Sequence, residues 1–313
     1  MSGQVAVTGA TGFIGGAICR ALRRDGWWVR ALVRSTAGSS SLRAVVDECI
    51  PGDLADGESL KNLVSGTRAV VHCAGTVRGA TREHFDRVNV GGTEKLLSAL
   101  SSLESSPRLL ALSSLAAREP QLSFYAASKR KAEEVLQRCR SGQPWVALRP
   151  PAVYGPGDRE LLPLFRLMAK GIAPIPGRRH ARFSMIYVDD IARLVVAWLR
   201  QGAMPNGIYS VHDGFTGGYS WDDVVAIASS ICNRRVHLLP IPAAFLWLPA
   251  SLNSLVGRIT GHAPMLTPGK LRELRHPDWV CDNSEINAVL DWKPQVQLEQ
   301  GLRNTPGWYS VPG

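Results

Sequence analysis

Short runs rich in β-branched residues alternate with amphipathic stretches along the first half of the chain. The runs at 4–8, 28–33, 69–72, 109–112 and 146–148 predict strands, and the stretches at 15–24, 59–64, 84–100 and 125–138 predict helices. Strands that alternate with helices are typical of a parallel sheet covered on both faces. Because crossovers between parallel strands are right-handed, the pattern predicts an α/β fold with a doubly wound parallel sheet.

Beyond Pro150 the pattern changes, because Pro and Gly become frequent and strand signals become sparse. A helix at 190–200, with Asp189 and Asp190 as its expected caps, and a strand at 208–211 still fit the first sheet. We therefore expect two units. The division places 1–154 in the sheet domain, with 185–211 returning to it, and 155–184 and 212–313 in a smaller C-terminal cap.

One apolar, Trp-bearing stretch at 243–255 has three interpretations. It lines a substrate pocket, it rests on a membrane surface as a peripheral contact, or it is plain core. Pro242 and Pro249 argue against one long helix there, because proline removes a backbone donor and clashes with the preceding turn.

The composition is that of an ordinary globular protein, with 45% hydrophobic and 20% charged residues in 313, which excludes disordered, collagen-like and coiled-coil classes. Six scattered Cys without zinc spacing predict reduced thiols and no metal site. The start does not resemble a signal peptide. The sequence has no run of about 18 apolar residues, the length that would predict a transmembrane segment. We therefore expect a cytoplasmic protein.

The net charge is +10, which alone would suit nucleic acid, an anionic membrane surface or a phosphate-bearing small molecule. The basic residues are mostly dispersed Arg, and no basic stripe interleaved with aromatics or nucleic-acid-binding motif occurs. We therefore expect a small-molecule substrate and no nucleic acid.

A glycine-rich segment, Thr8-Gly-Ala-Thr-Gly-Phe-Ile-Gly15, follows the first predicted strand and opens the first predicted helix. Gly9 allows a sharp turn, Gly12 lets the backbone approach a pyrophosphate, and Gly15 allows close packing of helix on strand. The phosphates would meet the N–H groups at the positive end of the helix dipole. The segment therefore predicts a dinucleotide site.

The end of the second strand bears on cofactor choice. Sites selective for NAD carry Asp or Glu there to bind the ribose 2′-hydroxyl, whereas this chain has Val33-Arg34-Ser35. Arg34 suits a 2′-phosphate, because guanidinium is a charged bidentate donor. NADP is therefore the predicted cofactor, with NAD as the alternative.

Tyr125 and Lys129 are four residues apart, so on a helix they share one face. A cation near the phenol favours the phenolate and brings its pKa towards the working range of an acid–base group. Ser114, with Ser113 as the fallback, ends a strand where its hydroxyl can stabilise charge on a carbonyl oxygen. These residues predict an acid–base site.

The chain resembles the extended short-chain dehydrogenase/reductase family. The matching segments are 8–15, Gly52-Asp53-Leu54, 71–75, Asn89 in VNVGGT, Ser114, Tyr125 and Lys129, 149–157, 186–190 and 291–294. The resemblance implies a Rossmann-type domain with a substrate-binding cap, and a homodimer. It also implies cofactor contacts from Gly9, Thr11, Gly12, Phe13, Ile14, Gly15, Arg34, Asp53, Leu54, Ala74, Gly75, Lys129, Pro150 and Val153. Asp53 would contact the adenine, and Lys129 the nicotinamide ribose. The resemblance further implies the choice of Ser114 over Ser113 and a catalytic triad of Ser114, Tyr125 and Lys129.

Within the family, the sugar-nucleotide branch carries an Asn where this chain has Ala152. The cap is similar in layout to the 3β-hydroxysteroid dehydrogenase and dihydroflavonol reductase-like branch. The resemblance thus implies an NADP(H)-dependent oxidoreductase that interconverts a hydroxyl and a ketone on a hydrophobic, cyclic small molecule. A sugar-nucleotide epimerase or dehydratase with tightly bound NAD(P) is the alternative. A non-catalytic cofactor-binding sensor or assembly subunit is the second alternative.

Overall fold

The computed structural model describes residues 3–34, 40–105, 107–139, 142–202, 204–261 and 263–309. Its centre is a seven-stranded sheet in the order β11-β6-β5-β4-β1-β2-β3, in which all neighbouring strands are parallel. The strands are β1 Gln4–Thr8, β2 Trp28–Val33, β3 Glu48–Pro51, β4 Ala69–His72, β5 Arg108–Leu112, β6 Trp145–Arg149 and β11 Gly207–Ser210. The predicted doubly wound parallel sheet is confirmed.

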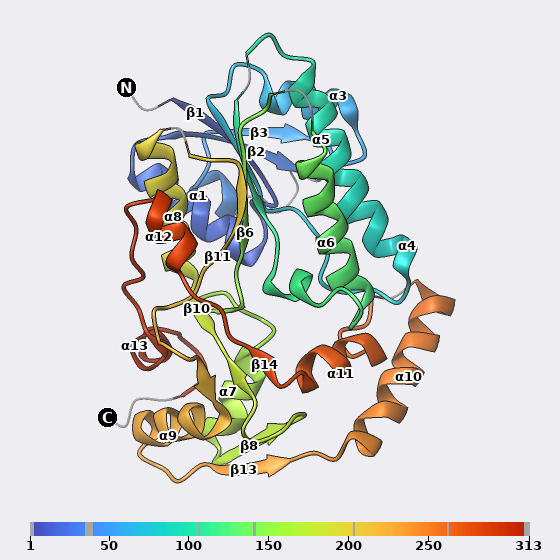
Figure 1. The fold of residues 1–313 in the computed structure, drawn as a ribbon, viewed down its shortest axis with the longest axis vertical. Helices are drawn as coiled ribbons and strands as arrows, with labels where there is room; N and C mark the ends of the chain where they lie inside the picture. The colour runs from blue at the N-terminus through green and yellow to red at the C-terminus, as the bar shows by residue number, and fades with distance from the viewer. Residues whose placement is uncertain are drawn as a thin grey trace.

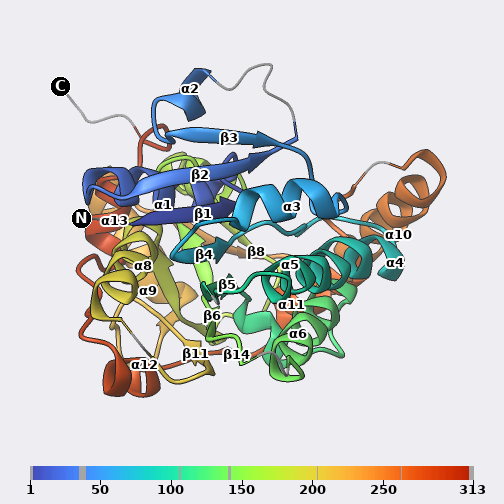
Figure 2. The same ribbon diagram turned by 90° about the horizontal axis from the view of Figure 1, so that it is seen from above.

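Helices cover both faces of this sheet (Figures 1 and 2). Val5 and Val7 of β1 face one hydrophobic core, while Ala6 between them faces the other. The first core includes α1 Phe13–Arg24 and α8 Val188–Gln201, and the second α3 Gly57–Val64, α5 Gly91–Ser101 and α6 Phe124–Gln137. Burial on both faces explains why these strands have nearly continuous apolar sequences.

The predicted helix at 84–100 is a composite. It consists of α4 Arg82–Phe85, a π-helical turn Asp86–Val90 and then α5. A short helix α2 Ser40–Arg43 precedes β3, and a 3₁₀ turn Leu115–Arg118 follows β5. The π turn matters for the site, because it carries Asn89.

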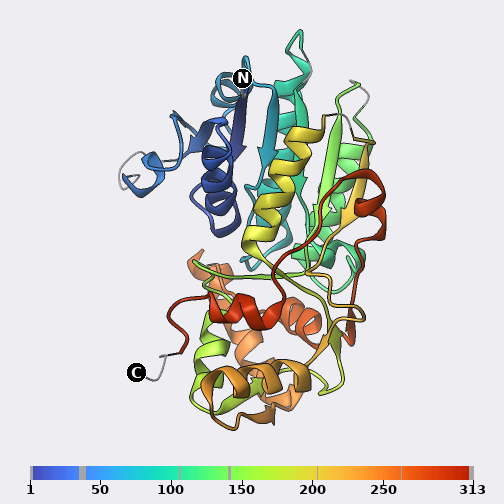
Figure 3. The same cartoon turned by 90° about the vertical axis from the view of Figure 1, so that its left-hand side faces the viewer.

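The cap lies beyond the carboxyl ends of the strands of the large sheet (Figure 3). Its sheets are small and pair β10 with β7, β13 with β8, and β12, β9 and β14 together. The strands are β7 Ala152–Tyr154, β8 Ile172–Ile175, β9 Arg182–Phe183, β10 Met185–Tyr187, β12 Tyr219–Ser220, β13 His237–Pro240 and β14 Asp278–Trp279. The helices of the cap are α7 Leu162–Ala169, α9 Trp221–Cys232, α10 Ala243–Thr260, α11 Pro268–Arg275 and α13 Leu298–Arg303, whereas α12 Ser284–Val289 packs beside β11 and contributes Ile286 to the first core.

Asp190 of α8 has a different role from the predicted helix cap. Tyr187 is the N-cap residue of α8 and makes no side-chain cap bond. The buried Asp190 carboxylate instead accepts hydrogen bonds from the backbone N–H groups of Gln295 (2.8 Å) and Val296 (3.0 Å). The C-terminal segment is therefore fastened directly to α8.

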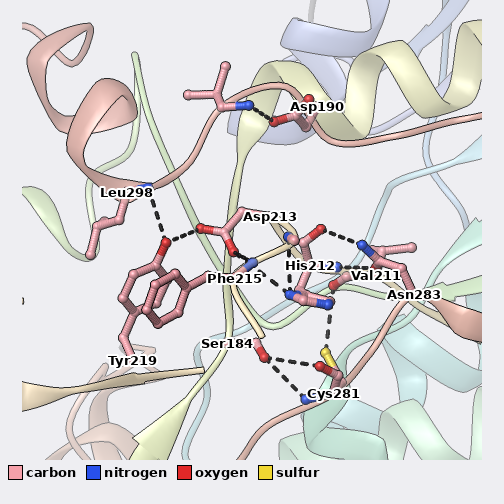
Figure 4. Close-up of polar contacts among 12 residues, drawn as sticks. Ser184, Asp190, Val211, His212, Asp213, Phe215, Tyr219, Cys281, Asn283 and Leu298 are labelled. Atoms are coloured by element: carbon pink, nitrogen blue, oxygen red, sulfur yellow. Dashed lines mark hydrogen bonds and ion pairs between the residues drawn. The ribbon is translucent and has the colours of Figure 1, made fainter. Parts of the chain in front are cut away.

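Further polar contacts in this region join the segments after β11 to the C-terminal part of the chain (Figure 4). Asn283 exchanges two hydrogen bonds with the backbone of His212, and the Tyr219 hydroxyl donates to Asp213 at 2.6 Å. The backbone N–H of Leu298 donates to the same hydroxyl. Segments far apart in sequence are thus held together by side chains that satisfy backbone groups.

The prediction that prolines would interrupt 243–255 is wrong, because α10 is one helix of 18 residues. Pro242 stands at its N-cap, before the turn in which backbone N–H groups have no helical partner. Pro249 lies inside the helix and removes only its own donor, and the remaining turns continue around it.

Candidate active site

The glycine-rich turn joins β1 to α1, with Gly12 as the N-cap residue of the helix. The Gly12 N–H donates to the Gly9 carbonyl at 2.9 Å. Gly9 has φ +73°, and a Cβ there would lie 2.7 Å from the Ala74 backbone N. A Cβ at Gly15 would overlap the Gly9 carbonyl oxygen, so helix and turn pack as closely as glycine allows.

This turn leaves a helix N-terminus free at the point where the strand order reverses, between β1 and β4. Thr11 and Gly12 are exposed, while Phe13 and Ile14 are half-buried against the first core. Ala74 and exposed Gly75 follow β4 across this reversal. Such a crevice at the carboxyl ends of parallel strands is where open α/β sheets bind ligands.

The residues predicted for the adenosine end follow β2 and β3, the next strands in the same sheet. Arg34 directly follows β2 and is exposed. The pairing of Val33 with Pro51 brings Arg34 to the same edge as Asp53, whose carboxylate accepts from Ala55 N–H at 2.6 Å. Leu54 instead packs against α5, since a Cβ at Gly92 would overlap its side chain.

Pro150 and Val153 lie where the chain leaves β6 for the cap. Pro150 is buried, and its carbonyl accepts from Leu115 N–H at 2.9 Å. Val153, in β7, packs against the first core. Since β6 leads through these residues into β7, the cap adjoins the carboxyl edge of the sheet.

The two serines after β5 have different partners. The Ser113 hydroxyl donates to Glu133 at 2.5 Å, and Glu133 is also bound by two hydrogen bonds from Arg149. The Ser114 hydroxyl instead accepts from Ala116 N–H at 3.2 Å and lies close enough to the Tyr125 hydroxyl to lower its pKa. The geometry therefore favours Ser114 over Ser113 as the serine that acts with the tyrosine.

Tyr125 and Lys129 project from the first turns of α6, which Ser123 caps by accepting from Ala126 N–H. The Lys129 ammonium donates to the Leu112 carbonyl at 2.7 Å. Burial lowers the pKa of Lys129 to about 8, and Cys73 and Glu133 oppose that shift. The lysine thus lies at the end of β5, beside the residue that precedes the two serines.

The pKa of Tyr125 departs from the sequence-based expectation. Burial raises this pKa, and the hydrogen bond with Ser114 opposes the rise. The cation that favours the phenolate is Lys270 of α11, which lies 6.0 Å from the centre of the tyrosine ring, and not Lys129. The reason is that Lys129 directs its ammonium to the Leu112 carbonyl.

Asn89 connects these groups from the π turn. Its side chain accepts from Thr76 N–H at 2.8 Å and donates to the hydroxyl of Ser128, the residue before Lys129. A Cβ added at Gly75 would lie 2.9 Å from the Asn89 oxygen and 3.4 Å from the Lys129 ammonium. The side chains of Asn89 and Lys129 therefore converge on the chain that follows β4.

A cavity of about 320 Å³ opens beside Tyr125. Its apolar lining includes Val77, Phe85, Leu255 and Met265, and its polar lining includes Lys270 and Glu273. Lys270 pairs with the buried Glu273 at 3.0 Å. The cap thus supplies both a hydrophobic wall and a charged pair next to the tyrosine.

Sequence reasoning missed Lys270 and Glu273. Their only local signal is a spacing of three residues, typical of any helical ion pair, and their proximity to Tyr125 depends on how the cap folds back. Asn89 was visible only as part of a matching segment, because the π turn that directs its side chain has no simple sequence pattern.

Two further findings concern the described residues only. They contain no group of three or more His, Cys, Asp or Glu side chains that could hold a metal ion. Within the same residues, every helix is too short or too polar to cross a bilayer.

Comparison with known proteins identifies relatives across the whole chain. Ceramide reductase of Caulobacter vibrioides is 35% identical over 99% of this chain and 96% of its own length. The 3 beta-hydroxysteroid dehydrogenase/Delta 5-->4-isomerase of Mycobacterium tuberculosis is 28% identical over 98% of this chain and 90% of its own.

A solved structure shares the fold. UDP-glucuronic acid 4-epimerase from Bacillus cereus, in complex with UDP-glucuronic acid and NAD, has a TM-score of 0.75 and 20% identity, covering 96% of this chain and 97% of its own. The model of the NAD dependent epimerase/dehydratase family matches residues 5–211. The chain therefore belongs to this family and is an NAD(P)-dependent enzyme.

Proposed function

We propose that this enzyme reduces a ketone to a hydroxyl on a hydrophobic lipid, using NADP(H) and the residues Ser114, Tyr125 and Lys129. The observation that carries the proposal is the position of Tyr125 in the wall of a largely apolar cavity, with the Ser114 hydroxyl close enough to lower the pKa of the phenol. A phenol held in this way is placed to exchange a proton with a substrate oxygen.

The glycine turn fits a dinucleotide. Any side chain at Gly9 or Gly15 would collide with backbone, so the N-terminus of α1 stays bare for a pyrophosphate. When bound, the nicotinamide supplies the hydride that adds to the carbonyl carbon. Lys129, below its pKa of about 8, carries the charge with which it would donate to the ribose hydroxyls.

In the proposed step, the Tyr125 hydroxyl gives its proton to the carbonyl oxygen as the new C–H bond forms. Ser114 donates a hydrogen bond to that oxygen and stabilises its developing charge. The raised pKa of Tyr125 keeps the phenol protonated at neutral pH, as a proton donor must be. The likeness to ceramide reductase, at 35% identity, supports reduction as the working direction.

For the substrate we propose a long-chain lipid of the ceramide class, ahead of the cyclic skeleton expected from the sequence. The relative that acts on ceramide is 35% identical, whereas the steroid enzyme is 28% identical. A sugar nucleotide fits less well, because Ala152 stands where that branch carries an Asn and the cavity walls are mostly apolar.

The test replaces Tyr125 with Phe, which removes the hydroxyl and keeps the ring. We expect kcat/KM with an N-acyl 3-ketosphinganine to fall by about 10²-fold or more, the usual contribution of a positioned acid. Binding of NADPH should be unchanged. Tyr209→Phe is the matched control, because that hydroxyl donates to the carbonyl of Pro205, which lies just before β11.

Substrate class is settled by comparing that lipid with a 3-ketosteroid and UDP-glucuronic acid. Faster turnover of the steroid would restore the cyclic substrate. Turnover that survives Tyr125→Phe within about tenfold would remove the tyrosine from the chemistry. If the wild type oxidises NADPH with none of the carbonyl compounds, the result would contradict the proposed reductase and favour the non-catalytic cofactor-binding alternative.

The choice of NADP depends on Arg34. We expect Arg34→Ala to weaken NADPH binding by about 1.5–3 kcal/mol, the worth of a hydrogen bond to a charged group, and to leave NADH binding nearly unchanged. Isothermal titration with both cofactors measures this difference. Equal losses for the two cofactors would contradict a role in binding the 2′-phosphate.

A further inference from the structure

Helix α10 leaves most of its apolar surface uncovered. Of its 18 residues only Ala250 and Gly257 are buried, and the helix stands away from the body of the molecule beside α11 (Figures 1 and 2). Seven of the 14 exposed large hydrophobic residues in the described chain belong to it. Phe245 and Ile259, near its two ends, are 73% and 76% exposed.

These side chains form a stripe along the helix. Phe245, Leu248, Leu252, Leu255 and Ile259 follow one another at spacings of three and four residues, which places them on one face. Val256 and Trp247 flank this face. A contiguous apolar face of this kind on a protein surface is typical of an interaction site.

The charged residues nearest to α10 in the sequence are basic. Residues 224–272 contain no Asp or Glu, although an even distribution of the 26 acidic residues would place about four there. The same segment contains Arg234, Arg235, Arg258, Lys270 and Arg272. Lys270 is paired with Glu273, so among the described residues the other four supply unpaired positive charge in the segment that carries the apolar helix.

We propose that α10 docks this enzyme on an anionic lipid bilayer, with the stripe of Phe245, Leu248, Leu252, Leu255 and Ile259 immersed in the interface. An apolar face flanked by basic residues is the pattern of helices that lie in the plane of a membrane. The basic residues that flank the stripe in the sequence distinguish this partner from an apolar protein surface, for which the sign of the flanking charge would not matter.

The position of α10 in the fold connects the proposed docking face with the cavity beside Tyr125. Ser251, Ser254, Leu255 and Arg258 of this helix line the cavity beside Tyr125, and Leu255 belongs to both the stripe and the cavity wall. A lipid leaving the bilayer along α10 would enter that cavity without crossing water. This route rests on the proposed function, whereas the docking itself does not.

The experiment measures co-sedimentation of the full chain with vesicles of phosphatidylcholine alone and of equal parts phosphatidylcholine and phosphatidylglycerol. We expect binding to the anionic vesicles that weakens with added salt, and at least tenfold weaker binding to the neutral ones. The triple variant Phe245→Ser, Leu248→Ser, Ile259→Ser should lose at least tenfold in binding to the anionic vesicles.

A matched triple variant, Trp28→Ser, Leu167→Ser, Ile172→Ser, removes exposed apolar side chains outside α10 and should bind as the wild type does. Melting temperatures check that both variants fold. Equal binding to both kinds of vesicle would overturn the role of charge. If no vesicle binds and the stripe variant instead abolishes a dimer seen by sedimentation velocity, the stripe joins two copies of the chain and the proposal is wrong.

Turnover is measured separately, with a short-chain ketone that needs no membrane. Vesicle binding by a chain that turns over no ketone would leave the docking intact and overturn the proposed function. Turnover without vesicle binding would do the reverse.

Discussion

The sheet domain and the cap bury their residues in different ways. All four residues of β4 are buried, and helices cover the sheet on both faces. The cap has sheets of two or three short strands, and α10 exposes nearly its whole length. The difference fits the proposed function, in which the closely packed half would hold the cofactor and the more open half would bind a hydrophobic ligand.

The largest effect that would test this comparison is expected at Glu133, which is 1% exposed and bound to Arg149 and Ser113. Glu133→Gln would leave the Arg149 guanidinium without its charged partner inside the protein. We expect the free energy of unfolding to fall by about 3–5 kcal/mol, measured by urea denaturation.

Glu134→Gln is the matched control, because this neighbour is half exposed and pairs with Arg130 and Arg138 at 3.6 and 3.5 Å. Its effect should stay within about 0.5 kcal/mol. Similar losses for the two variants would mean that the sheet domain does not depend on its buried pair.

A smaller effect is expected where the glycine turn meets α1. Gly15→Ala would force a Cβ against the Gly9 carbonyl, so α1 must move away from the turn. We expect a loss of about 1–3 kcal/mol in unfolding free energy, the usual cost of overpacking, with weaker NADPH binding. Calorimetry and cofactor titration measure the two.

Gly16→Ala tests the same helix one residue later. A Cβ there would lie 3.4 Å from the Ala10 oxygen, an ordinary contact, and alanine favours a helix. This variant should be neutral or slightly stabilising. Equal losses of unfolding free energy from the two substitutions would show that the turn is no more tightly packed than its surroundings.

The smallest expected effect is a pH dependence of NADPH binding, caused by Lys129 at the border between the two halves. Burial lowers the pKa of Lys129 to about 8, so the ammonium is charged below that pH and is lost as the pH rises through it. NADPH binding, followed by fluorescence, should weaken above about pH 8. Lys129→Arg should keep its charge and bind with little pH dependence, since arginine stays protonated. Wild-type affinity that is flat across this range would separate the charge of Lys129 from cofactor binding.

The strands of the large sheet could be predicted because burial decides their sequences. The predicted runs 4–8, 28–33 and 69–72 coincide with β1, β2 and β4. The missed strand, β3, reads Glu-Cys-Ile-Pro and is only partly buried at the edge of the sheet. Its apolar signal is therefore weak.

The cap was harder to predict because its structure depends on contacts distant in sequence. The two-residue strands β9 and β14 pair with each other although about 95 residues separate them. Likewise, the spacing of Tyr125 and Lys129 is local and visible, whereas the approach of Lys270 to that tyrosine follows from tertiary folding.

The fastening of Asp190 by the backbone of Gln295 and Val296 bears on modularity. The family model ends at residue 211, yet Ile286, Leu290 and Trp292 belong to the same core as β1 and α8. A chain cut at that point would leave a buried carboxylate without two of its donors and one core open to solvent. We therefore expect that the matched segment would not fold on its own, and that grafting a new cap onto it would require keeping the segment from Asn283 to Val296.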